Sequence, residues 1–192
     1  MFKYQSSHRA RCFPVLAAAF IGTCVCFTGC SDPGALEDPE TNHTTAPSVA
    51  LQTAIIEGDD QAVYEHILAG NSVNTRSAMG DTPLHIAAAM GRSYATEVLI
   101  GAGADLEAVN NSGATPLFNA AFFCHKDVLK KLIDAGGSTN ITDANGTTIQ
   151  QIMSTPWEQM FPIYEMVHRS IGLPFDKSRI ESARAEIAEM LR

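Results

Sequence analysis

The chain has 192 residues, a mass of 20.6 kDa, 45% hydrophobic residues and 18% charged residues. This composition excludes a fully disordered or collagen-like polymer, and the length favours a single domain. Thirteen Lys and Arg against 21 Asp and Glu give a net charge of -8, which repels phosphate backbones and argues against nucleic acid as a partner.

The first segment has the order of a secretory signal peptide. Residues 1–11 contain three basic residues and no acid, and they lead into the uncharged apolar run CFPVLAAAFIGTCVCF. No charge occurs from Cys12 to Ser31, so an uncleaved membrane anchor is an alternative on length alone. Pro14 and two threonines make this run a poor membrane span.

The apolar run ends at Gly29-Cys30, and here the sequence resembles the lipobox of bacterial lipoproteins. The resemblance implies a signal peptide over residues 1–29 and lipidation of Cys30, and Ser31 after the cysteine implies an outer-membrane anchor facing the periplasm. Plain secretion with cleavage at another small residue is the other alternative. Removal of residues 1–29 leaves 10 basic and 21 acidic residues, a net charge of -11.

After Cys30 comes a segment that cannot form a packed core. Residues 31–46, SDPGALEDPETNHTTA, contain two prolines, four acids and few apolar side chains. Too little apolar surface is available to offset the entropy cost of ordering the chain. We therefore predict a flexible tether over residues 30–47.

A repeat of 33 residues dominates the remainder of the chain. Gly80, Gly113 and Gly146 are each 33 residues apart, and GDTPLHIAAAMGRSYATEVLIGAGADLEA aligns with GATPLFNAAFFCHKDVLKKLIDAGGSTNI. In each copy a threonine followed by a proline predicts a helix start, because the threonine hydroxyl can cap an orphan amide and proline is tolerated at the first helical position. Self-similarity at this period indicates a repeat architecture.

These copies resemble ankyrin repeats, whose T-P-L-H-x-A-A hallmark is complete at residues 82–88 and reads Thr-Pro-Leu-Phe-Asn-Ala-Ala at 115–121. The resemblance implies an all-α solenoid of helix-turn-helix units joined by hairpin loops. We expect about four repeats over residues 48–176 and a C-terminal capping helix over residues 177–192.

The outer units depart from the pattern, as terminal repeats of solenoids do. In the first unit, Ser48 is the expected N-cap. The fourth unit begins at Gly146 and inserts residues around 155–162, so its second helix is expected over 163–170. The capping box Ser178-Arg179-Ile180-Glu181 predicts the start of the last helix.

The residues able to carry chemistry favour a protein that is not an enzyme. The ankyrin resemblance implies that His85 is a strut, bonded to the threonine hydroxyl and to the neighbouring loop. Cys124 and His125 are adjacent, so their side chains point in different directions, and Cys124 occupies the position of Gly91 in the preceding repeat. No Cys-x-x-Cys and no i, i+4 histidine pair occurs, so neither a metal nor another cofactor is predicted.

A small enzyme remains a minor alternative. Its site would lie in the irregular segment 153–175, where His168 with Glu165 or Asp176 supplies the acid-base candidates.

The candidate partner-binding residues lie at repeat positions whose side chains the solenoid does not need. In ankyrin repeats, the two positions after the paired alanines tend to face the concave groove, and the hairpin tips vary. In the alternative that stays open, the fourth repeat folds over the two phenylalanines and makes them core. The predicted binding residues are Asp81, Met90, Asn111, Ala114, Phe122 and Phe123.

The resemblance implies a monomeric, non-catalytic module that binds another protein through its hairpin tips and concave helix face. The acidic mature domain favours a basic partner. Three roles stay open: protection or retention of an envelope enzyme, immunity against a toxin in the periplasm, and scaffolding of an assembly.

Overall fold

The computed structural model describes residues 49–140 and 142–191. The signal peptide, Cys30 and the whole tether therefore lie outside the described residues. Within the described part, helices follow one another in antiparallel pairs and no strand occurs beyond a single bridge between Thr142 and Thr148. None of the described helices is long and apolar enough to cross a membrane.

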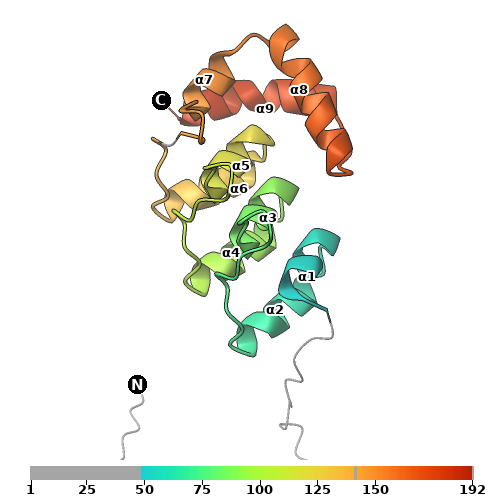
Figure 1. The fold of residues 1–192 in the computed structure, drawn as a ribbon, viewed down its shortest axis with the longest axis vertical. Coiled ribbons are helices and arrows are strands. Elements are labelled where there is room, and N and C mark those ends of the chain that lie inside the picture. Colours follow the sequence, from blue (N-terminus) through green and yellow to red (C-terminus); the bar gives the residue numbers. More distant parts are fainter. Residues whose placement is uncertain (1–48, 141, 192) are drawn as a thin grey trace, which may run out of the picture. The chain divides into compact units, whose positions relative to one another are not determined.

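Three helix pairs repeat with the period found in the sequence, and a fourth, irregular unit follows them (Figure 1). The first helices of the three pairs contact one another in one layer, and the second helices contact one another in a second layer. The expected all-α solenoid is thus confirmed. The helices are α1 (Leu51–Glu57), α2 (Asp60–Leu68), α3 (Pro83–Met90), α4 (Ser93–Gly101), α5 (Pro116–Phe122), α6 (Lys126–Asp134), α7 (Ile149–Ser154), α8 (Trp157–Ser170) and α9 (Lys177–Met190).

The Thr-Pro signals begin helices as expected. The Thr82 side chain accepts the backbone N–H of His85, and the Thr115 side chain accepts that of Phe118 at 3.2 Å. Each threonine is buried and N-caps its helix, an interaction worth about 1 kcal/mol. Thr148 begins α7 in the same way, so the fourth unit starts in register.

The core follows the apolar positions of the repeat. The leucine after each Thr-Pro is completely buried, and the paired alanines let neighbouring helices approach closely. The core side chains with no exposed surface include Ala54, Ile55, Leu84, Ala87, Ala88, Leu99, Leu117, Ala120, Ala121, Leu129, Leu132 and Ile149.

Three helix boundaries differ from the sequence predictions. Helix α1 takes Ala50 as its N-cap, with no side-chain hydrogen bond, and the predicted N-cap Ser48 lies outside the described residues. Helix α8 already begins at Trp157 and continues through Pro162, although proline removes one helical hydrogen bond. Helix α9 is capped by Asp176, which accepts the backbone N–H of Arg179 at 3.0 Å, so the expected box at Ser178 does not form.

The fourth unit closes the end of the stack with aromatic and charged side chains. Helix α9 contacts α6 and α7, as Figure 1 shows at the red end of the chain. Arg184 of α9 is 6% exposed, and its Nη2 donates to the carbonyls of Ile152, Met153 and Thr155 at 2.6–3.1 Å. These carbonyls belong to the last turn of α7 and to its C-cap Thr155, where the helix dipole favours a cation.

Candidate protein-binding face

The three hairpin tips form a hydrogen-bonded row along one side of the stack. The backbone N–H of Asn111 donates to the carbonyl of Met79 at 3.0 Å, and that of Ala144 donates to Ser112 at 2.9 Å. Within each tip, a turn glycine has positive φ, such as +76° at Gly80. The tips are therefore fixed relative to one another by main-chain bonds, which leaves their side chains available to a partner.

Polar side chains reinforce this row between the first and second tips. Asn110 Nδ2 donates to Asp81 Oδ1 at 2.8 Å, and Asn111 Nδ2 donates to the carbonyl of Ala78 at 3.1 Å. Met79, in contrast, is 70% exposed at the end of the first tip. An apolar side chain this exposed on a rigid loop is suited to contact with a protein partner.

Beside the tips, apolar side chains recur at equivalent positions of the inner helices α1, α3 and α5. Residues 33 apart in the stacked repeats point the same way, so Ile56, Ala89 and Phe122 form one row. Ile56 is 48% exposed, whereas Ala89 and Phe122 are half-buried. We define the inner strip as the half-buried or exposed residues Ile56, Ile86, Ala89, Met90, Asn119 and Phe122.

The inner strip ends in a hollow of about 380 Å³ between α5 and the second and third tips. Aromatic rings of α5 form its floor, and amide, hydroxyl and carboxylate groups of the two tips form its rim. We call it the tip hollow, and it is lined by Asn110, Ser112, Ala114, Phe118, Asn119, Phe122, Phe123, Asp143, Ala144 and Asn145.

The structure corrects two of the predicted binding residues. Phe123 is 8% exposed and Ala114 is 5% exposed, so neither presents an open surface. The rings of Phe122 and Phe123 pack edge to face at 5.2 Å, and α8 covers them with Tyr164 and His168. The alternative in which the fourth unit folds over the pair therefore holds for Phe123.

The other predicted residues remain accessible in different degrees. Asn111 is exposed, while Asp81, Met90 and Phe122 are half-buried. The tip hollow brings Ala114, Phe122 and Phe123 together, and Asp81 and Asn111 lie in the row of tips. Two further accessible residues of this face, Ile56 and Ile86, were not predicted from the sequence, and neither was Phe118, which is buried but lines the tip hollow. The 33-residue register nevertheless places the first two on the same face as Met90 and Phe122.

His85 is a structural residue, as the resemblance implied. Its ring has no exposed surface, Nδ1 lies 2.8 Å from Thr82 Oγ1, and Nε2 donates to the carbonyl of Ala114 at 3.0 Å. Desolvation by burial lowers the pKa of His85, so the neutral ring is retained. His85 therefore ties the second hairpin to α3.

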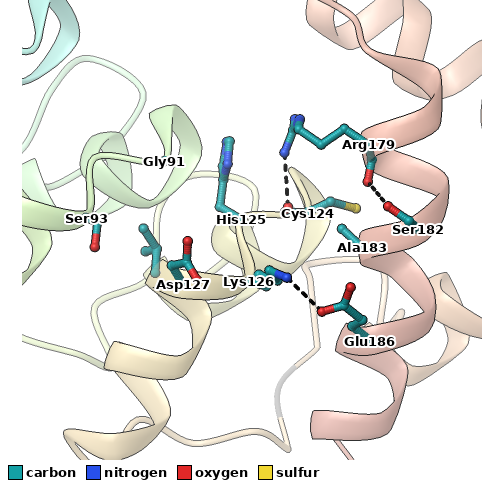
Figure 2. Close-up of a pocket in the computed structure, with 11 residues that line it drawn as sticks. Gly91, Ser93, Cys124, His125, Lys126, Asp127, Arg179, Ser182, Ala183 and Glu186 are labelled. Atoms are coloured by element: carbon teal, nitrogen blue, oxygen red, sulfur yellow. Dashed lines mark hydrogen bonds and ion pairs between the residues drawn. The ribbon is translucent and has the colours of Figure 1, made fainter.

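A second hollow, of about 220 Å³, lies where two inter-helix turns meet α9 (Figure 2). Three of its charged groups already have partners in the protein: Lys126 Nζ pairs with Glu186 at 2.9 Å, and Arg179 Nη1 donates to the carbonyl of Cys124 at 3.2 Å. His125 Nε2 donates to the carbonyl of Ala89 at 3.1 Å. These contacts hold repeats together.

Cys124 and His125 do not form a nucleophile and base. Figure 2 shows the Cys124 sulfur directed toward α9 and the His125 ring directed away from it. The Cys124 thiol contacts the Tyr164 hydroxyl, with 3.8 Å between sulfur and oxygen. Burial raises the pKa of the Cys124 thiol, and desolvation followed by the charge of Arg179 lowers the pKa of His125 to about 4. A protonated thiol beside a weak base is unsuited to nucleophilic catalysis.

The acid-base candidates of the irregular segment are also engaged in the fold. His168 is 1% exposed and its Nδ1 donates to the carbonyl of Tyr164 at 2.8 Å, while Glu165 pairs with Arg169 and Asp176 caps α9. Among residues 49–140 and 142–191, no group of three or more His, Cys, Asp or Glu side chains could hold a metal ion.

A model of the family described as "Ankyrin repeats (3 copies)" matches residues 50–143. Residues 50–143 are ankyrin repeats. The ankyrin match covers the three regular helix pairs and ends within the third hairpin, so the fourth unit and α9 lie beyond it. Ankyrin repeats of this kind constitute a protein-binding module.

The chain is similar to parts of several known proteins. It is 33% identical over 100 residues to an inactive serine/threonine-protein kinase of Bos taurus, covering 52% of this chain and 7% of that protein. It is 28% identical over 117 residues to an ankyrin repeat-containing protein of Schizosaccharomyces pombe, covering 60% of this chain and 54% of that protein. It is 34% identical over 89 residues to NF-kappa-B inhibitor zeta of Bos taurus, covering 43% of this chain and 12% of that protein. The chain thus spans about half the length of the second protein and a small part of the other two.

Proposed function

We propose that this protein is a lipid-anchored ankyrin module of a bacterial envelope that binds a basic protein partner through its hairpin tips and inner strip. The observation that carries the proposal is the continuity of the row of tips, the inner strip and the tip hollow on one side of the stack. Apolar side chains at the centre and polar groups at the rim are the usual composition of a protein interface.

Charge favours a basic partner. Acidic side chains border this face at Glu57 of α1, Asp81 of the first tip and Asp143 of the third tip. Hydrogen bonds from the Thr147 and Asn145 backbone lower the pKa of Asp143, so its carboxylate stays charged. Such complementarity acts mainly on the association rate and its salt dependence.

The proposal assigns the lipid anchor to Cys30, a tether to residues 30–47, repeats to residues 48–176 and a cap to residues 177–192. It rests on the basic start, the apolar run and the Gly29-Cys30 pair in the sequence. Replacement of Cys30 by Ala should release the protein from the outer-membrane fraction. Equal membrane association of the Cys30→Ala variant and the parent would contradict the lipid anchor.

The binding face is tested by photo-cross-linking in cells. A photoreactive amino acid replaces Asn111 on the second tip or, as a matched control, Tyr64, which is 43% exposed on the outer helix α2. We expect a discrete cross-linked species only from position 111. Cross-linking from position 64 alone would place the interface on the outer helices.

A further inference from the structure

We infer that the tip hollow is a specificity pocket for one aromatic or large aliphatic side chain of a peptide segment that also carries basic residues. The inference rests on the proposed binding function and deepens it, because it names the side chain that the binding face selects.

The hollow lies where the third repeat departs from the second at one position. In the second repeat, His85 donates from Nε2 to the carbonyl of Ala114 and so holds the second hairpin against α3. The equivalent residue 33 positions later is Phe118, and the equivalent carbonyl belongs to Thr147. Phenylalanine has no donor, so this tie between helix and hairpin cannot form in the third repeat.

The rest of the third hairpin is equivalent to the second. The carbonyl of Thr147 accepts the backbone N–H of Asp143 at 3.0 Å, as that of Ala114 accepts the N–H of Asn110 at 3.0 Å. Within the described residues, no α5 side chain donates to Thr147. The hairpin therefore keeps its fold without the hydrogen bond from the helix side chain. The Phe118 ring, which is 6% exposed, lies in the wall of the hollow.

The lining of the hollow indicates what enters it. The half-buried ring of Phe122 supplies most of its aromatic surface, and the nearly buried rings of Phe118 and Phe123 add only their edges. This apolar surface favours an apolar side chain and especially an aromatic one. The exposed side chains of Ser112 and Asn145 stand at the rim, where a peptide main chain has donors and acceptors to satisfy. A pocket of about 380 Å³ falls within the size range of small-ligand sites and accommodates one large side chain.

Charge sets the flanking residues of the bound segment. Asp143 lines the hollow, and Asp81 borders the neighbouring tips. The guanidinium of Arg76, the basic residue of the first hairpin, donates to the carbonyls of Gly80 and Val109 at 3.1 and 2.6 Å, so these main-chain bonds hold it within the protein. A Lys or Arg next to the inserted side chain would meet a carboxylate at the rim.

The test uses a library of random linear peptides displayed on phage and selected on the immobilised full-length protein. We expect enrichment of peptides with one aromatic or large aliphatic residue beside Lys or Arg. Phe118→His, which introduces the residue of the second repeat, should restore the helix-hairpin tie and weaken the selected peptides at least ~10-fold without lowering the melting temperature. Phe118→Leu keeps an apolar wall and should retain affinity within about 3-fold.

Two results would overturn the inference. Selected peptides that bind Phe118→His as tightly as the parent, but lose affinity in Met79→Ser or Asn111→Ala, would keep the binding face and remove the pocket. Failure to select any peptide would contradict the pocket. Selection of peptides whose affinity none of these substitutions changes would contradict both the pocket and the binding face. Melting curves of each variant show that a loss of affinity is not a loss of folding.

Discussion

The Nε2 atom of His85 donates to the carbonyl of Ala114 at 3.0 Å, joining an inner helix to the hairpin that follows 29 residues later. Both groups are buried, so replacing the histidine by phenylalanine leaves the carbonyl with one partner fewer. We expect His85→Phe to lower the free energy of unfolding by about 1–3 kcal/mol, measured by urea denaturation. Phe118→His at the equivalent position should not lower it, and equal losses in both variants would contradict this assignment.

Stability should fall with acid because of His125. Its pKa is about 4 in the folded protein against 6.5 as the ordinary value, so the unfolded chain binds more protons between these pH values. The neutral ring therefore contributes stability that is fully present above pH 6.5 and is lost as the pH falls toward 4. The contribution is about 3 kcal/mol.

His125→Gln provides the control, because glutamine can donate to the Ala89 carbonyl but does not titrate. We expect its unfolding free energy to change less between about pH 7 and pH 4.5 than that of the parent. His85 also has a lowered pKa, so a residual dependence of the same sign should remain. An unchanged pH profile in His125→Gln would show that another group is responsible.

The turn after the first helix of a repeat shows how far the repeat register predicts the structure. Gly91 has φ of +69°, and a Cβ there would lie 2.5 Å from His125 Nδ1, so glycine is required at this turn. Cys124 occupies the same position one repeat later, as the 33-residue register predicted, and the structure gives it φ of +58°. The carbonyl of Cys124 accepts a hydrogen bond from Arg179 of α9 at 3.2 Å, a contact that no local pattern could indicate.

Long-range packing explains what the sequence could not predict. The Thr-Pro helix starts, the leucine core and the paired alanines follow local rules and were predicted. His168 covers Phe123, and Tyr164 contacts Phe122. His168 and Tyr164 both belong to α8, which lies about 40 residues further along the chain and continues through Pro162. Burial of Arg184 was likewise unpredicted, because its compensation comes from α7 carbonyls and the rings of Trp157 and Tyr164.

The two adjacent phenylalanines should behave differently when truncated. Phe123 is buried, so Phe123→Ala should cost about 3–5 kcal/mol of unfolding free energy. Phe122 is half-buried in the inner strip, so Phe122→Ala should cost less and weaken peptide binding. Thermal melts combined with binding isotherms measure both effects, and an equal loss of stability in the two variants would place Phe122 in the core.

Gly136 has φ of +95°, and a Cβ on this residue would meet no atom within 4 Å, so backbone strain alone opposes a larger side chain. We expect Gly136→Val to lower the unfolding free energy by about 1–2 kcal/mol. Gly101→Ala is the control, because Gly101 is the last residue of α4 with equally open surroundings, and alanine should stabilise it by up to about 1 kcal/mol. Chemical denaturation of the two variants should therefore give opposite signs.

Amide hydrogen exchange of the full-length protein, with and without a selected peptide, tests the binding face most directly. We predict that the peptide slows exchange in the hairpin tips 77–81, 110–114 and 143–147 and in the last turns of α3 and α5. Slowed exchange confined to the outer helices α2, α4 and α6, with unchanged hairpin tips, would contradict a binding face formed by the tips and the inner strip.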